Sequence, residues 1–411
     1  MGYSYNMETS KKDNRSTISL SACHLMFNII NLFISTFLVA HIYSLTDNLY
    51  SYAFNVGVFQ LSTYACMLVS YFLFSFVVDK TNRVWIYRIA NIIEAILVLI
   101  TIFYGKDLAK IVILAGLLNG LSHGAYYASY NVLKQEMVSR KSMDKFIIVI
   151  TVLSKVVNVV CPILLGALIE VSSFSMVAIY VLILATIQTI LSFFIKAKRP
   201  EDSNFNLKNY FKKLKKPSKI NKKIKFLYKI VAIYGLTSIV SMLLKINIMM
   251  QFGSNFSLGT ITSIFSVVAI ITLLLMKRFT KYGKRFWLFI ATGSLQIVGT
   301  VIFVIMPNMV TLIIYYFFYA ICEIINGTIC DLIRNKNFKE NGMYQDIAEH
   351  QCVVESLLQI TRIISFALLM LVSTIHSYIA YQIFFVVVMV VYTIMSLMLM
   401  LYERKDNNDK F

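Results

Sequence analysis

Long apolar blocks separated by short polar segments limit most strongly how this chain can fold. A helix crosses a bilayer with about 20 apolar residues, and charged and turn residues delimit twelve blocks of that order here. A transmembrane β-barrel would instead show strands of about ten residues with alternating polarity. The expected spans are 20–44, 52–78, 84–103, 108–133, 146–170, 174–195, 226–251, 256–276, 286–306, 309–333, 348–371 and 378–402. The pattern predicts an all-α polytopic membrane protein.

The composition excludes a soluble protein and gives no sign of a cofactor. Charged residues make up 14% and hydrophobic residues 58% of the chain, whereas soluble domains have about 25% and 45–50%. The six cysteines form no Cys-x-x-Cys pair and have no histidine at ligand spacing. We therefore expect neither a disulfide framework nor a metal site, and no cofactor.

Basic residues in the connecting segments predict the orientation. Of the 39 Lys and Arg residues, 33 lie in the two terminal tails and in alternate connections, and two lie in the other connections. The positive-inside rule places the basic side in the cytoplasm, with both termini. The short loops and the Lys/Asn/Ile-rich composition favour a bacterial cell membrane. The predicted parts are a tail 1–19, a bundle 20–195, a basic linker 196–225, a bundle 226–402 and a tail 403–411. Topogenic charge beside anionic lipid accounts for the net charge of +19, so no nucleic-acid partner is needed.

A repeated basic string divides the chain into two six-helix halves. Residues 78–83 read Val-Asp-Lys-Thr-Asn-Arg after the second span, and residues 280–285 read Thr-Lys-Tyr-Gly-Lys-Arg after the eighth, 201 residues later for Asp79 and Thr280. Duplicated bundles are typical of secondary transporters. The chain resembles the major facilitator superfamily (MFS), whose loop after helix two reads roughly Gly-x-x-x-Asp-Arg-x-Gly-Arg-Arg.

This resemblance implies two pseudo-symmetric bundles and a gate at the repeated loop. In the family, the loop latches the two halves on the cytoplasmic side. The corresponding residues here are Asp79, Lys80, Arg83, Lys281, Gly283 and Arg285. The alternative is a loop that only fixes topology.

The resemblance also implies a central cavity lined by helices one, four, seven and ten. A charge inside a span costs about 2.5–3.5 kcal/mol on insertion scales, so such residues are functional candidates. The candidates for the cavity are Glu323, His123, Lys245, Tyr126, Tyr127, Tyr130, Asn119, Asn326 and Asn31.

Glu323 is the main candidate for proton coupling. The repeat partner of Glu323 is Ser122, beside His123, so we expect His123 and Glu323 to face one another across the pseudo-two-fold axis. Alternatives are a structural pair of Glu323 with Lys245, direct contact of Glu323 with substrate, and a hydrogen-bonded core role for His123. The three tyrosines follow glycines at i+4 spacing, which favours either close helix packing or a stacking wall for a ligand.

A second set of polar residues predicts a network between helices five and eleven. Glu355, Gln359 and Arg362 lie at i, i+4 and i+7, on one helix face. Lys155 and Asn158 share a face of helix five, and Lys155 is the repeat neighbour of Glu355. Structural pairing and a functional role both remain open for this network.

These patterns favour a secondary transporter that moves a small solute by alternating access, coupled to protons or another ion. Export is slightly favoured by the aromatic cavity and by Pro162 and Gly166, which resemble part of the Gly-Pro-x-x-Gly-Gly stretch of drug–proton antiporters. The spans and loops show no nucleophile–base constellation, which argues against an enzyme. The alternative is a transporter-like receptor or interaction partner without transport. The expected partners are the bilayer, the solute and the coupling ion, with the chain as a monomer.

Overall fold

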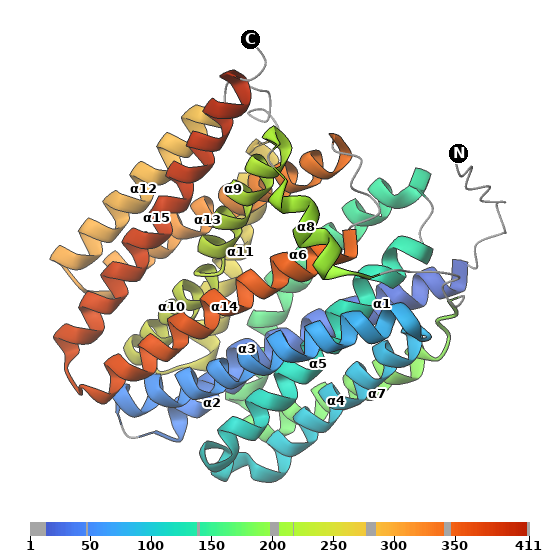
Figure 1. Ribbon diagram of the computed structural model, residues 1–411. Coiled ribbons are helices and arrows are strands. Elements are labelled where there is room, and N and C mark those ends of the chain that lie inside the picture. Colours follow the sequence, from blue (N-terminus) through green and yellow to red (C-terminus); the bar gives the residue numbers. More distant parts are fainter. Residues whose placement is uncertain are drawn as a thin grey trace, which may run out of the picture.

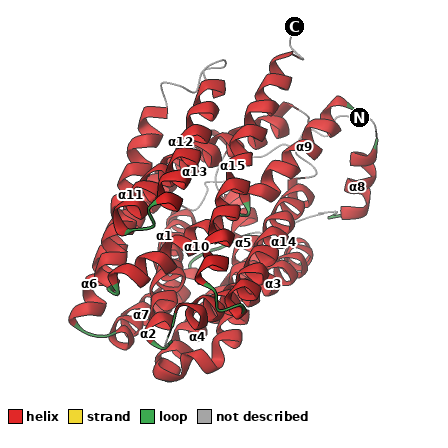
Figure 2. Ribbon diagram, turned by 90° about the vertical axis from the view of Figure 1, so that its left-hand side faces the viewer, coloured by secondary structure: helices red, strands yellow, loops and turns green. Residues whose placement is uncertain are grey.

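The computed structural model describes residues 14–46, 48–137, 140–197, 205–216, 218–276, 285–340 and 347–408, which fold into helices without strands (Figures 1 and 2). In the first half the helices are α1 (Asn14–Leu32), the π-helix η1 (Phe33–Leu38), α2 (Val39–Ser44), α3 (Leu49–Lys80), α4 (Arg83–Tyr104), the 3₁₀ segment η2 (Gly105–Ile111), α5 (Val112–Met137), α6 (Arg140–Val171) and α7 (Phe174–Ser192). A short helix, α8 (Leu207–Lys215), follows. The second half contains α9 (Lys219–Tyr234), α10 (Thr237–Phe252), α11 (Asn255–Met276), α12 (Arg285–Ile305), α13 (Met309–Glu340), α14 (Ile347–Thr374) and α15 (Tyr378–Asn408).

Eleven stretches of the described chain are long and apolar enough to cross a membrane. One of them, Arg83–Lys134, has 52 residues and contains α4, η2 and α5. Because α4 and α5 pack side by side, this stretch reverses direction at η2 and crosses twice. The other crossings each correspond to one predicted span. The all-α polytopic fold expected from hydropathy is thus confirmed, with η2 as the turn between the predicted third and fourth spans.

The beginning of α1 and the end of α15 lie on one side of the bundle, as does α8 (Figures 1 and 2). We term this side the terminal side and the other the distal side. On the distal side, Asn48 accepts a hydrogen bond from the amide of Ser51 and begins α3. Ser173 caps α7 in the same way through the amide of Met176. Short capped turns therefore join the distal helix ends.

A glycine face holds α5 close to α3. Side chains at Gly116, Gly120 and Gly124 would meet the carbonyl oxygens of Phe59 and Thr63 and the side chain of Ser70, all within 3 Å. Only residues without a side chain let two helix backbones approach so closely. The close-packing alternative of the sequence analysis is thereby confirmed for these three glycines.

The two halves meet along two helix pairs, α3 with α14 and α6 with α11. At the second pair the backbones touch: Gly259 of α11 faces the carbonyl of Pro162, and Gly166 of α6 lies against Asn255. Among the described residues α6 and α14 do not form a packed pair. The expected contact between helices five and eleven is therefore wrong, since helix five packs on helix eight and helix eleven on helix two.

The basic linker contains a helix that packs against the second half. α8 buries Tyr210 and Leu214 and leaves Phe211 exposed. The hydroxyl of Tyr210 shares hydrogen bonds with the hydroxyl of Tyr228 on α9, at 2.5 Å, and with Nδ1 of His350 on α14, at 3.1 Å. Just before α8, the amide of Asn206 donates to Oε1 of Glu349, at 2.9 Å. The linker is thus fixed to α9 and α14.

Candidate functional site

The first and seventh spans are both irregular in the middle. The first changes from α1 to the π-helix η1 over Phe33–Leu38, and the seventh is interrupted at Gly235 and Leu236 between α9 and α10. The repeat offset of 201 residues maps residues 33–38 onto 234–239, so both irregularities occupy the same place in their halves. π-Helical segments and broken helices in membrane proteins often mark binding sites.

A polar cavity lies between these two spans. It has two compartments of about 380 and 410 Å³. The lining residues common to both compartments are Asn158, Ser241, Thr262, Ser266 and Tyr316. Because the compartments share a wall and both halves contribute to it, they form one candidate site between the halves.

The first compartment has two opposite charges. Glu323 of α13 and Lys155 of α6 both line it, and Lys155 acts electrostatically on Glu323. Tyr319 and Tyr316, about one and two helix turns before Glu323, form the adjacent wall. The site thus combines a carboxyl group with an ammonium group from the other half.

The second compartment contains Lys245 of α10. Its Nζ donates to the carbonyl oxygen of Ser35, at 2.9 Å, and to Oγ1 of Thr36, at 3.0 Å. Both acceptors belong to η1, so these hydrogen bonds join the two halves beside the cavity. The alternative in which Lys245 pairs with Glu323 is not what the structure shows.

A polar stripe on the first span was missed as a unit by the sequence reasoning. His24, Asn28, Asn31 and Ser35 all line the second compartment. They lie at i, i+4, i+7 and i+11, and this spacing along an apolar helix is a signal that could have found His24 and Ser35. Nδ2 of Asn28 donates to Ser154 of α6, at 2.9 Å, which aligns the stripe with helix five.

Of the four aromatic residues predicted for the cavity, Tyr126 and Tyr130 are buried in the first half, and His123 and Tyr127 are half-buried. Tyr126 is fully buried and stacks on Phe27 with ring centroids 3.5 Å apart. His123 and Tyr127 pack around the same phenylalanine, and Tyr130 stacks on His24. His123 lies within electrostatic range of Arg362. These residues do not line either compartment, so the expected approach of His123 to Glu323 is wrong: α5 turns this face toward α1.

Two asparagines predicted for the cavity instead join neighbouring helices. Asn119 of α5 donates to Oγ1 of Thr63 on α3, at 3.4 Å. Asn326 of α13 donates to Ser396 on α15, at 2.9 Å. Both asparagines are buried. Of the nine predicted cavity residues, Glu323, Lys245 and Asn31 line the cavity.

The network predicted between helices five and eleven divides into two separate groups. Lys155 and Asn158 line the cavity. On α14, Nη1 of Arg362 donates to Oε1 of Gln359, at 3.3 Å, and Nε2 of Gln359 donates to Glu355, at 3.5 Å. The guanidinium of Arg362 lies 5.1 Å from the ring centre of Tyr64 on α3. The two groups are separate because α6 packs on α11 and α14 packs on α3.

The predicted gating loop is described only at Arg83. This residue is buried, and its Nε donates to the carbonyl oxygen of Val78, at 3.4 Å. The side chains of Asp79, Lys80 and Arg285, and the residues Lys281 and Gly283, lie outside the described part. The gate therefore stays a prediction.

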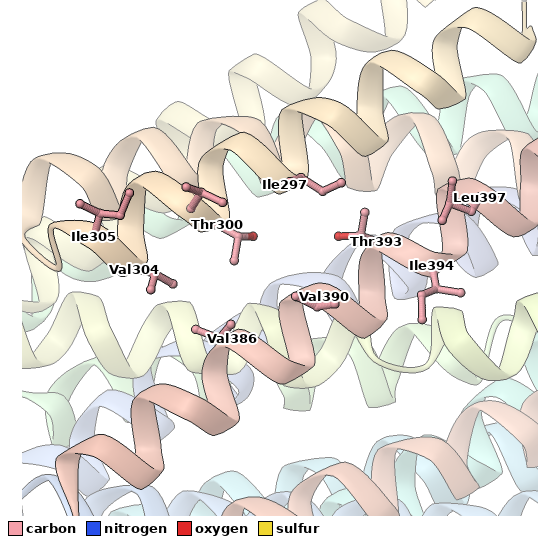
Figure 3. A pocket seen from close by; sticks show the side chains of 10 residues that line it. Ile297, Thr300, Val304, Ile305, Val386, Val390, Thr393, Ile394 and Leu397 are labelled. Atoms are coloured by element: carbon pink, nitrogen blue, oxygen red, sulfur yellow. The ribbon is translucent and has the colours of Figure 1, made fainter.

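A third cavity, of about 350 Å³, lies between α12 and α15 (Figure 3). Branched apolar side chains such as Ile297 and Val390, each 54% exposed, line it. The hydroxyls of Thr300 and Thr393 point into the space but donate to carbonyls of their own helices. With its polar groups satisfied, this groove suits hydrocarbon and offers no recognition chemistry for a polar solute.

Comparisons with known proteins agree with the geometry. Residues 17–340 match the sequence profile of the Major Facilitator Superfamily. The chain belongs to this superfamily. A curated relative, the uncharacterized protein YqgE of Bacillus subtilis (strain 168), is 25% identical over 161 residues, which cover 38% of this chain and 37% of that protein.

Solved structures of MFS transporters share the fold. A variant of the nucleoside transporter NupG aligns with a TM-score of 0.66 and 14% identity, covering 94% of this chain and 99% of the other. A bacterial homologue of the iron transporter ferroportin, in an inward-facing state, aligns with 0.65 and 12%, covering 96% and 99%. The human organic anion transporter MFSD10 aligns with 0.61 and 12%, covering 94% and 99%. At these identities the likeness shows the fold alone.

Membership of the superfamily confirms the resemblance inferred from the repeated loop. The chain is a multi-pass membrane protein of a transporter family, and the family points to transport and not to an enzyme. The cavity between the halves of this MFS protein is the site on which a more specific function can be argued.

Proposed function

We propose that this chain is a secondary active transporter that carries a small polar solute through the cavity between its halves. The main support for this proposal is the cavity itself. It contains Lys155 from one half and Glu323 from the other, with hydroxyl and amide side chains around them. A site built from both halves changes its exposure when the halves rock, which is the basis of alternating access. A single chain supplies all of these residues, so the proposal is for a monomer.

Contacts between the halves on the distal side support such a movement. Lys245 joins α10 to η1, and Oε1 of Glu170 on α6 accepts a hydrogen bond from Ser254 before α11, at 2.8 Å. These hydrogen bonds lie beside the apolar packing of α3 on α14, where Gly57 meets Met370. Their release would open the cavity toward the distal side.

Glu323 is the proposed proton-coupling group. A carboxyl group in low dielectric changes its proton affinity when a nearby positive charge moves. Lys155 lies in the other half, so rocking of the halves changes its distance from Glu323. Among the described residues, Tyr316, Tyr319 and Tyr392 also interact electrostatically with this carboxyl group. Proton uptake and release would then follow the conformational cycle.

We propose no direction of transport. Export was favoured by an aromatic cavity wall and by Pro162 and Gly166. The tyrosines of α5 pack inside the first half, and Pro162 and Gly166 form the close crossing of α6 with α11. Both patterns thus have a packing explanation.

We also propose that the terminal side faces the cytoplasm and that the protein lies in the cell membrane. The basic tails, the linker helix α8 and the basic loops support this orientation. Labelling of single cysteines introduced at Thr46 and at Lys212 tests it in intact cells. An impermeant reagent should label only the first; labelling of the second would reverse the orientation.

A matched pair of carboxyl variants tests proton coupling. Proteoliposomes containing the wild type, Glu323→Gln or Glu94→Gln are assayed for solute uptake with and without a pH gradient. The solutes are those that raise the unfolding temperature of the detergent-purified wild type in a panel of amino acids, sugars, nucleosides, organic acids and dyes. Glu94 is the control because it has the same carboxyl group but lies in the interior of the first half, where it accepts a hydrogen bond from Gln188.

Glu323→Gln should remove the response to the pH gradient, with at least about a tenfold loss of gradient-driven uptake, whereas Glu94→Gln should keep it. A tenfold loss corresponds to about 1.4 kcal/mol. Equal responses of Glu323→Gln and the wild type would refute proton coupling through Glu323. Solute binding without any transmembrane flux in the wild type would favour the receptor alternative.

A further inference from the structure

We infer that Lys245 and the polar stripe of α1 bind an anionic group of the solute, so that the substrate is a small hydrophilic organic anion or zwitterion. This inference rests on the proposed transport function and specifies its substrate class. The acceptors of the solute would be carboxylate or phosphate oxygens, which share the same recognition chemistry at an ammonium group.

The second compartment is lined by groups that bind polar solutes. Its walls include the amides of Asn28, Asn31 and Asn158, together with hydroxyls from Ser35 and Ser241. Tyr316 is the aromatic residue it shares with the first compartment. A wall of amides and hydroxyls favours solutes that form hydrogen bonds, and it offers little apolar contact area to an amphipathic compound.

The charges of the cavity are unequal. Among the described lining residues, Lys155 and Lys245 are positive and Glu323 is negative. Lys155 and Glu323 belong to the same compartment and compensate each other. Lys245 is left as the excess positive charge, in the compartment that contains no carboxylate among its lining residues.

Both hydrogen-bond partners of Lys245 are neutral. They are the carbonyl of Ser35 and the hydroxyl of Thr36. An ammonium group has three N–H donors, so one donor remains for a ligand. A buried charge that lacks an opposite charge is destabilising, and an anion bound from the cavity recovers part of that cost. The site is therefore completed by an anionic ligand.

Binding of the anion affects the contact between the halves. The same ammonium group holds α10 to η1 through Ser35 and Thr36. An anionic group competes with these neutral acceptors, because charge-assisted hydrogen bonds are stronger. Solute binding thus weakens a link between the halves and couples occupancy to opening.

The test uses pairs of probes that differ in charge but little in shape. They are lactate with lactamide, glutamate with glutamine, and glycerol 3-phosphate with glycerol. Affinity is measured from the rise in unfolding temperature of the full-length, detergent-purified protein at increasing probe concentration. The variants are Lys245→Met, Lys245→Arg, Thr36→Val and the control Lys229→Met, which changes an exposed lysine of α9 that lines neither compartment. Each is first checked for a monodisperse profile in size-exclusion chromatography.

We expect at least one anionic probe to stabilise the wild type while its uncharged partner does not. Lys245→Met should lower that affinity at least about tenfold, Lys245→Arg should restore part of it, and Lys229→Met should leave it unchanged. Thr36→Val removes one competitor for the ammonium group and should raise anion affinity severalfold. A purely structural role for Lys245 would predict no such gain. The carboxylate and phosphate pairs distinguish the two possible anionic groups.

Two results would overturn the inference. One is stabilisation of the wild type by uncharged probes as well as by their anionic partners, with Lys245→Met unchanged. Proton-coupled uptake of those uncharged probes would then leave the proposed transport function intact. The other is a wild type that binds none of the anionic probes but transports sugars or nucleosides. Failure of uptake for every stabilising probe would instead contradict the transport proposal.

Discussion

Helices α5 and α13 occupy equivalent places in the two halves, yet only α13 lines the cavity. α13 contributes Tyr316, Tyr319 and Glu323 to the first compartment. Neither compartment includes a residue of α5 among its described walls. Both helices have clustered tyrosines, so the difference does not come from aromatic content.

The difference comes from how closely each helix packs on its neighbour. Gly116, Gly120 and Gly124 hold α5 against α3. The repeat offset maps these positions onto Phe317, Ile321 and Ile325 of α13. Large side chains stand at these positions of α13, whereas glycine brings α5 into contact with α3. The comparison teaches that α5 is used for close packing within the first half, whereas α13 supplies the carboxyl group of the cavity, Glu323.

The largest expected effect comes from filling the glycine face. Gly120→Leu places a side chain against the carbonyl of Thr63 and the side chain of Cys66, so little folded protein should be recovered. Overpacking of this kind costs about 1–3 kcal/mol or more. Ile321→Leu, at the equivalent position of α13, should behave like the wild type. Yield and unfolding temperature after size-exclusion chromatography measure both; equal losses in the two variants would remove the proposed asymmetry.

A smaller effect separates the tyrosines of the two helices. Tyr316 lines both compartments, so Tyr316→Ala should weaken solute binding about tenfold or more with a stable fold. Tyr126 is hydrogen-bonded to Nδ1 of His24 at 2.8 Å, so Tyr126→Phe should lower stability by about 1 kcal/mol. Solute affinity should change little in that variant. Thermal unfolding with and without the stabilising solute distinguishes the two results, and the comparison fails if Tyr126→Phe loses more affinity than Tyr316→Ala.

The smallest effect is expected at His123. This residue packs beside Phe27 and Tyr127, away from the cavity, so His123→Asn should leave uptake within about twofold of the wild type. His24→Asn should change the concentration dependence of uptake, because His24 lines the second compartment. Initial rates in proteoliposomes over a range of solute concentrations provide the measurement. A larger effect at His123 than at His24 would indicate that α5 lines the solute pathway after all.

Much of the fold was predictable from the sequence because hydropathy, basic loops and glycine spacing are local signals. The spans, the repeat and the role of Gly120 were found in this way. Two of the cavity residues, Glu323 and Lys245, were found because a charge inside a membrane span is costly and therefore indicates a function.

The partners of these residues were not predictable from spacing. In a membrane both lipid and the protein interior are apolar, so the pattern along a helix does not show which neighbour each face meets. Lys155 was assigned to α14 and faces α13, and the tyrosines of α5 were assigned to the cavity and face α1. Both errors concern which helices pack together, which depends on the glycine contacts at Gly120 and Gly259.

The crossing of α6 and α11 has a mechanical consequence. The carbonyl of Pro162 and the backbone of Gly259 are in direct contact, so the two helices cannot approach further and have little freedom to slide there. That contact acts as a fulcrum, and each half is a lever arm on either side of it. Because Gly259 lies near the distal end of α11, a rotation of a few degrees at the fulcrum moves the terminal-side ends of the two helices most. Enlarging Gly259 should therefore displace the helix ends much more than it displaces Pro162.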